Sequence, residues 1–212
     1  MNNEYDEIHQ KRFQNTLEII KEYDILKDDQ TVLSLGDPCG FKEILLNSFD
    51  VDIETTTDDL RSIVLYDNVF NLVLCLEVIE HIKDIDSDNI EDLAQFTGSG
   101  IKHMLQQSYN SLKPGGYLLI STPNLHCYKT LYNWVIRDSL LTYDPHPREL
   151  SEKYIRLQTQ NLFESVSVIY KNSWHGHGVP KDFVRKGKAF LDLIGESSYN
   201  REEDNVFFVC RK

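Results

Sequence analysis

Positive charge is scarce in this sequence of 212 residues. It has 22 lysines and arginines against 34 aspartates and glutamates, which gives a net charge of -12. Binding to nucleic acid relies largely on lysine and arginine contacts to phosphates. The basic residues here form only short clusters, such as Arg185, Lys186 and Lys188. The composition therefore argues against a nucleic acid as substrate or partner.

Cysteine and long apolar segments are also sparse. No apolar run approaches the ~20 residues that span a bilayer, and residues 1–7 are polar and acidic, unlike a secretory signal. The cysteines form no paired motif, which argues against a disulfide framework; they are Cys39, Cys75, Cys127 and Cys210. We expect a cytoplasmic protein without a membrane span, and nothing in the sequence indicates an oligomeric state.

Apolar strand patterns alternate with amphipathic helix patterns along the chain. Strands are predicted at residues 31–35, 50–57, 70–76, 117–121, 163–170 and 206–210, and helices at 4–23, 41–48, 90–97, 101–112 and 181–194. The strand at 70–76 is almost continuously apolar, as expected where helices cover both faces of a parallel sheet. The pattern predicts one doubly wound α/β domain over residues 1–212. Residues 1–28 would hold an N-terminal helix, and residues 123–160 a helical insertion over the cleft.

A glycine-containing turn follows the first predicted strand. The sequence there is Ser34-Leu35-Gly36-Asp37-Pro38-Cys39-Gly40. A strand, a tight turn and a helix in this order let backbone N–H groups approach a ligand at the carboxyl edge of a sheet. Because glycine has no Cβ, Gly36 and Gly40 would permit that approach. Taken alone, the same pattern also fits an ordinary loop.

Two more motifs follow in a characteristic order. Glu77-Val78-Ile79-Glu80-His81 comes directly after the strand at 70–76, and Leu112-Lys113-Pro114-Gly115-Gly116 precedes the strand at 117–121. With the glycine turn, these motifs resemble the class I S-adenosylmethionine-dependent methyltransferases, particularly a Glu-x-x-Glu-His subgroup that includes small-molecule O-methyltransferases. The resemblance covers residues 30–125. It implies a Rossmann-like sheet of seven mostly parallel strands, with the last strand antiparallel.

The resemblance also implies how S-adenosylmethionine would be bound. The glycine turn would hold the methionine end, an acid after the second strand would accept hydrogen bonds from the ribose hydroxyls, and an acid followed by an apolar residue would contact the adenine. The cofactor-binding candidates are Gly36, Asp37, Gly40, Glu54, Asp58, Asp59 and Leu60. The chain departs from the family pattern at Ser34, where an acid is usual, and at Pro38, where a glycine is usual.

Glu77, Glu80 and His81 are the catalytic candidates, because they follow the carboxyl end of a strand, where α/β sites lie. In relatives that methylate small-RNA 3′ ends or act in ubiquinone synthesis, this motif resembles a divalent-metal site. With His146, which lies in a segment similar to a downstream motif of many relatives, these residues would bind Mg²⁺ or Mn²⁺ and lower the pKa of an acceptor hydroxyl. Alternatively, His81 acts as a general base without a metal. A third interpretation is that Glu80 and His81 simply open a helix.

These observations predict methyl transfer to a hydroxyl, in preference to an amine, of a small metabolite, sugar or lipid-linked acceptor. One alternative is a metal-dependent 2′-O-methyltransferase acting on RNA 3′ ends. The other is a catalytically silent methyltransferase-like binding protein, suggested by the altered glycine turn.

Overall fold

The computed structural model describes residues 3–36, 40–83, 100–137, 146, 149–173, 179–195 and 202–212. The helices are α1 (Asn3–Glu22), α2 (Phe41–Leu46), α4 (Gly100–Ser111), α5 (Tyr128–Arg137), α6 (Glu152–Thr159) and α7 (Lys181–Leu193), with a short 3-10 helix η1 (Ile79–His81). The strands are β1 (Gln30–Leu35), β2 (Val51–Thr56), β3 (Phe70–Leu76), β4 (Leu112–Pro123), β5 (Ser165–Lys171) and β6 (Asn205–Arg211).

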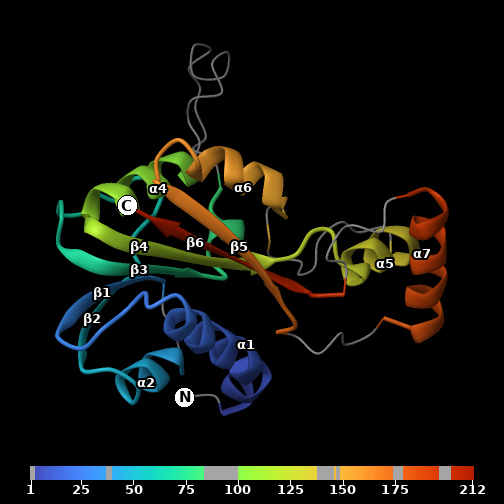
Figure 1. Cartoon of the computed structure of the whole chain (residues 1–212), viewed down its shortest axis with the longest axis horizontal. Coiled ribbons are helices and arrows are strands. Elements are labelled where there is room, and N and C mark those ends of the chain that lie inside the picture. The colour runs from blue at the N-terminus through green and yellow to red at the C-terminus, as the bar shows by residue number, and fades with distance from the viewer. Residues whose placement is uncertain are drawn as a thin grey trace.

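The strands form one sheet in the order β2-β1-β3-β4-β6-β5 (Figure 1). β2, β1, β3 and β4 are parallel, and β6 runs antiparallel to both β4 and β5. The predicted doubly wound fold and antiparallel last strand are confirmed. The predicted strand number is corrected, because the described residues form six strands rather than seven. Only residues 57–69 connect β2 to β3, too few for a crossover helix and a further strand.

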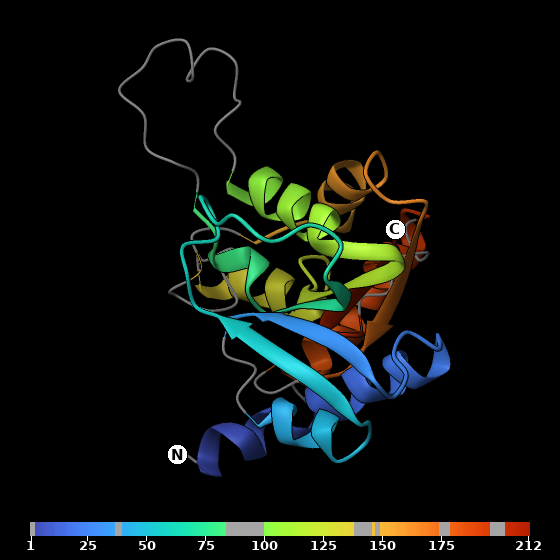
Figure 2. The same cartoon turned by 90° about the vertical axis from the view of Figure 1, so that its left-hand side faces the viewer.

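Helices cover both faces of the sheet, as Figure 2 shows from the β2 edge. On one face, Phe13 of α1 and Phe41 of α2 pack with strand residues such as Leu72. On the other, Met104 of α4 and Ile155 of α6 join a second apolar cluster. Strand side chains alternate between the two clusters, which explains why β3 is apolar at every position except Asn71.

The segment from α4 to β4 differs in detail from the prediction. The helix ends at Ser111, as the lysine-proline-glycine-glycine motif predicted, but β4 begins at the next residue and is longer than the predicted strand. Its pairing with β3 is irregular between Phe70 and Leu72. Gly115 has φ +75°, which accommodates this irregularity. The predicted helix at 90–97 lies outside the described residues.

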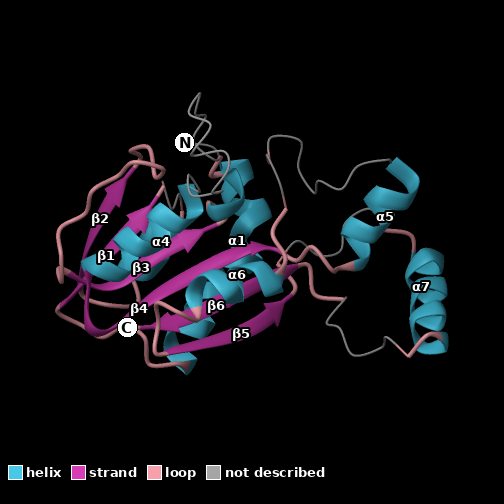
Figure 3. Cartoon of the chain, turned by 90° about the horizontal axis from the view of Figure 1, so that it is seen from above, coloured by secondary structure: helices cyan, strands magenta, loops and turns pink. Residues whose placement is uncertain are grey.

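The helices of the predicted insertion take two different positions. α6 packs beside α4 on one face of the sheet, whereas α5 packs with α7 beyond the end of the sheet (Figures 1 and 3). The ring of Tyr132 meets Phe183 of α7 at 5.1 Å between centroids. That the whole segment covers the cleft stays a prediction. None of the described helices is long and apolar enough to cross a bilayer.

Candidate active site

The loop after β1 brings a glycine against the segment that follows β3. Gly36 has φ +80°, a conformation that favours glycine, and its N–H donates to the carbonyl oxygen of Thr56 at 2.8 Å. A Cβ placed on Gly36 would lie 3.1 Å from Cγ2 of Val78. Gly40 precedes α2 as its N-cap, and Asp37 lies outside the described residues. The loops after β1 and β3 therefore meet closely.

An open pocket of about 530 Å³ lies between the loop after β2 and the segment after β3. It is lined by Asp58, Asp59, Leu60, Arg61, Val78, His81, Ile82 and Lys83. Val78 both lines this pocket and neighbours the Cβ position of Gly36. Two of the predicted ribose-binding acids and the predicted catalytic histidine thus line one crevice, and the glycine loop adjoins it at Val78. The crevice lies at the carboxyl edge of the sheet, where α/β proteins place their ligands.

The three candidate acids in and after β2 have different surroundings. Asp58 accepts a hydrogen bond from Oγ1 of Thr56 at 3.0 Å. Asp59 accepts from Nε and Nη2 of Arg61 at 2.9 and 2.7 Å. These hydrogen bonds lower the pKa of Asp59 to about 2, so its carboxylate is ionised at neutral pH. Glu54 lies within β2, is exposed, and is absent from the pocket lining.

Contacts from three other elements hold the side chain of Glu77. Its Oε1 accepts hydrogen bonds from Oγ of Ser121 in β4 and from Nδ2 of Asn205 in β6, both at 2.8 Å. Its Oε2 lies 4.0 Å from Nη1 of Arg12 in α1. The backbone of Glu77 has φ +55°, uncommon for a residue other than glycine. Glu77 thus fixes the turn after β3 to α1, β4 and β6.

Glu80 is fully buried, yet its two oxygens have unequal surroundings. Oε2 accepts a hydrogen bond from Oγ1 of Thr122 at 3.1 Å. Oε1 has no hydrogen-bond partner among the described residues and lies 3.9 Å from Nε2 of His146. Burial raises the pKa of Glu80 well above its usual value, and the nearby Glu77 carboxylate raises it further. Such a carboxylate favours a bound proton or cation.

His81 and His146 meet next to Glu80. Their ring centroids are 4.6 Å apart, with the rings nearly perpendicular. His81 is exposed on the pocket side, and partial burial, with a smaller effect of His146, lowers its pKa below 6.5. The ligating atoms of Glu80, His81 and His146 lie within 4.8 Å of one another. Three of the four predicted metal ligands are therefore together, and Glu77 lies outside this group.

The site also contains residues that the sequence analysis did not single out. Glu149 is buried, with Oε1 at 2.9 Å from Nδ1 of His146. Ser121 and Thr122 lie near the carboxyl end of β4, a parallel strand. Their position could therefore have marked them in the sequence as candidate site residues. Arg12 and Asn205 are remote in sequence from the motifs and carry no local signal.

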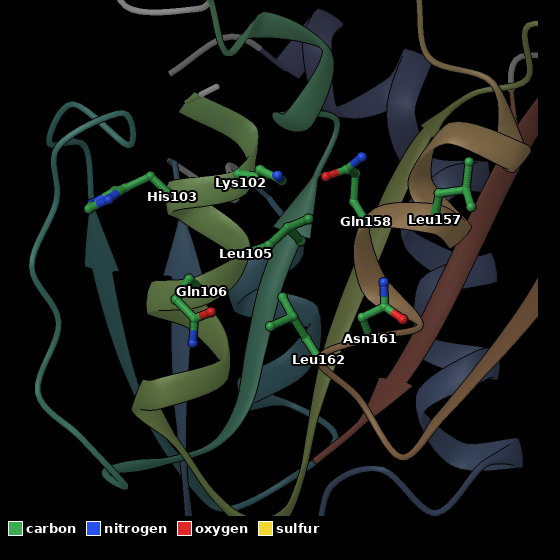
Figure 4. A pocket seen from close by; sticks show the side chains of 8 residues that line it. All are labelled: Lys102, His103, Leu105, Gln106, Leu157, Gln158, Asn161 and Leu162. Atoms are coloured by element: carbon green, nitrogen blue, oxygen red, sulfur yellow. The ribbon is translucent and has the colours of Figure 1, made fainter. Parts of the chain in front are cut away.

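A second groove, of about 430 Å³, lies between α4 and α6 (Figure 4). Its lining residues are Lys102, His103, Leu105, Gln106, Leu157, Gln158, Asn161 and Leu162. None of the predicted site residues lines it. The crevice beside Val78 is therefore the candidate active site.

Comparison with protein families identifies one domain. A family model described as a methyltransferase domain matches residues 9–165. This range contains the loop after β1, the pocket lining and the group formed by Glu80, His81 and His146. No curated protein matches the sequence.

Solved methyltransferase structures share the fold at low sequence identity. A S-adenosylmethionine-dependent methyltransferase from Archaeoglobus fulgidus has a TM-score of 0.62 and 14% identity, covering 100% of both chains. The putative methyltransferase of a Haloferax volcanii complex with the Trm112 activator has a TM-score of 0.60 and 12% identity, covering 99% of this chain and 94% of that one. Phosphoethanolamine N-methyltransferase 2 from Haemonchus contortus has a TM-score of 0.57 and 15% identity, covering 94% of this chain and 52% of that one.

Proposed function

The chain belongs to the methyltransferase domain family and is a S-adenosylmethionine-dependent methyltransferase, and from this premise we propose that it methylates a hydroxyl group of a small metabolite, sugar or lipid-linked acceptor. One observation carries the proposal: His81, Glu80 and His146 gather proton-accepting groups beside the crevice. A hydroxyl loses its proton as its oxygen attacks carbon, so it needs such a group at that moment.

The residues around the crevice fit the cofactor. The absence of a Cβ at Gly36, whose φ is +80°, lets the loop after β1 pack closely on Val78, which lines the crevice. The oxygens of Asp58 and Asp59 are acceptors suited to ribose hydroxyls, and the buried Leu60 offers an apolar contact beside them. When bound, S-adenosylmethionine supplies a methyl group on a positively charged sulfur that departs as a neutral thioether.

In this proposal His81 accepts the proton of the acceptor. Its imidazole lines the pocket, and its lowered pKa keeps it neutral at pH 7. The pocket lining holds two acids and two cations, Asp58 and Asp59 against Arg61 and Lys83. This balance suits an acceptor of low net charge. It offers little attraction to a polyanion, so we place the RNA 3′-end alternative second.

Metal assistance is a second candidate for activating the acceptor. The observation that favours it is Oε1 of Glu80, which is buried without a hydrogen-bond partner among the described residues and lies near two imidazoles. Carboxylate and imidazole ligands suit Mn²⁺ as well as softer divalent ions, and Mg²⁺ prefers oxygen. Glu80, His81 and His146 would hold the ion, which would lower the pKa of the acceptor hydroxyl. Turnover would then disappear after dialysis against a chelator and return with Mn²⁺ or Mg²⁺.

An amine acceptor is the main chemical rival to a hydroxyl. A neutral amine attacks through its lone pair and loses its proton afterwards, so it needs no base during attack. The Haemonchus contortus neighbour is named as an N-methyltransferase. A substrate screen should therefore include amines as well as hydroxyl compounds.

The test is a methyl-transfer assay of the purified protein with panels of hydroxyl and amine acceptors, read by mass spectrometry. We expect methyl ethers as products. For the best acceptor, His81→Gln should lower kcat by about 10²–10⁴-fold, the usual contribution of a general base. His103→Gln is the matched control, because His103 lines the groove between α4 and α6. Methylation of amines alone, or full activity of His81→Gln, would contradict the proposal.

The catalytically silent alternative is distinguished by binding. Calorimetry that detects no association with millimolar S-adenosylmethionine would favour a binding protein over an enzyme.

A further inference from the structure

A buried carboxylate stands behind the histidine pair. Glu149 has a side chain only 2% exposed, and its Oε1 lies 2.9 Å from Nδ1 of His146. His146 is itself 6% exposed and turns its other nitrogen, Nε2, toward Oε1 of Glu80 at 3.9 Å. The three groups therefore form a row in the order Glu149, His146, Glu80.

The chemistry of the carboxylate fixes the direction of the first contact. A carboxylate accepts hydrogen bonds and an N–H group donates them, so the 2.9 Å contact fits a tautomer of His146 in which Nδ1 carries the hydrogen and donates it to Glu149. In that tautomer the lone pair lies on Nε2. Nε2 faces Oε1 of Glu80, and the ring of His146 meets the ring of His81 edge to face.

We propose that Glu149 is a positioning residue that fixes the tautomer and ring orientation of His146, so that Nε2 faces Glu80 next to the ring of His81. The inference rests on the proposed function, because it gives His146 a part in the same site. Carboxylates hold imidazoles in this way in many metal and acid–base sites. His146 then presents a fixed acceptor atom, for a proton or for a cation, behind His81.

The chain around Glu149 is suited to this task. The next residue, Leu150, is 4% exposed and belongs to the apolar cluster on the α4 face. Ser151 then caps α6, its side chain accepting a hydrogen bond from the N–H of Tyr154 at 3.2 Å. Core packing and a capped helix thus hold Glu149 in place. Burying a carboxylate is unfavourable without a charged or hydrogen-bonding partner, and His146 provides that partner.

The direct test is the tautomer of His146, measured by two-bond ¹H–¹⁵N correlation spectra of full-length protein labelled with ¹⁵N-histidine. The His146 signals are assigned with a His146→Asn variant. We expect Nδ1 to be the protonated nitrogen in the wild type. Glu149→Gln should populate both tautomers, because a carboxamide can donate as well as accept. Glu149→Leu, which fills the same space without an acceptor, should also lose the single tautomer.

Glu152→Gln is the control, since Glu152 in α6 accepts hydrogen bonds from Tyr170 of β5 and from Arg156 one turn along the same helix. Its His146 signals should match those of the wild type. A wild-type His146 protonated on Nε2 would overturn the proposal. So would an unchanged His146 tautomer in whichever Glu149 variants fold, as judged by their thermal unfolding.

Activity provides the second arm. Glu149→Gln should lower kcat by about 10–100-fold, the usual cost of losing a group that orients a functional histidine, while the KM for S-adenosylmethionine stays the same. The two hypotheses fail differently. If wild-type protein methylates no hydroxyl acceptor, the proposed function fails, whereas the tautomer measurement needs no substrate and tests Glu149 alone.

Discussion

Replacing Gly36 with alanine should have two effects, a loss of stability from backbone strain and a loss of cofactor binding, and a control variant can separate them. The φ of +80° costs a residue with a Cβ about 1–2 kcal/mol. The new Cβ would also lie 3.1 Å from Cγ2 of Val78, so Val78 has to move by a few tenths of an ångström. Gly115 provides a matched control. Its φ is +75°, but a Cβ there meets no atom within 4 Å. Gly115 lies near the start of β4, at the opposite end of the parallel strands from the crevice.

Both variants should lose stability to a similar extent. In a domain of 150–250 residues each 1 kcal/mol lowers Tm by about 2–4 °C, so Gly115→Ala should lower Tm by about 2–8 °C and Gly36→Ala by at least as much. Only Gly36→Ala should weaken S-adenosylmethionine binding, by at least about tenfold or 1.4 kcal/mol. Thermal unfolding and calorimetry at a temperature where both variants are folded measure the two effects. Equal Kd values for the two variants would refute the assignment of the cofactor to this loop.

Three other predictions concern charged groups of the site. Because only neutral His81 accepts a proton and its pKa is lowered from 6.5, the methyl-transfer rate should fall to half of its plateau at a pH below 6.5. A midpoint at or above pH 6.5 would contradict this. Glu77→Leu should lower the free energy of unfolding, measured in urea, by about 2 kcal/mol, because the buried donors of Ser121 and Asn205 lose their acceptor. The control Glu18→Ala, which removes an exposed ion pair, should change it by less than about 0.5 kcal/mol. Asp59→Asn should weaken cofactor binding at least about threefold with unchanged stability. Asp182→Asn, which alters an exposed ion pair on α7, should leave binding as it is.

Local pattern was sufficient for most elements of the fold. The nearly continuous apolar run from Phe70 to Leu76 predicted β3 with its observed bounds, because a strand that is buried on both faces is apolar at almost every position. The number of strands was not predictable in the same way. It depends on what the short connection at residues 57–69 can form, and the family resemblance suggested one strand more than that length allows.

The site was predictable where it follows strand ends and unpredictable where it depends on distant contacts. His81 and Asp59 line one pocket because the carboxyl ends of parallel strands share an edge. Glu77 looked like a ligand from its motif. Its oxygens instead meet donors 44 and 128 residues away, in Ser121 and Asn205. No local pattern reports such separations, so its catalytic role stays a prediction.

The position of β6 has a consequence for how the enzyme matures during synthesis. β6 follows every other described element in the sequence, yet it is inserted between β4 and β5 and supplies Asn205 to Glu77. A nascent chain that has emerged only as far as β5 lacks both the middle strand of that half of the sheet and one of the donors that hold the turn after β3. The methyltransferase should therefore acquire activity only after translation has passed residue 205, and a stalled ribosome–nascent-chain complex that ends earlier should be inert.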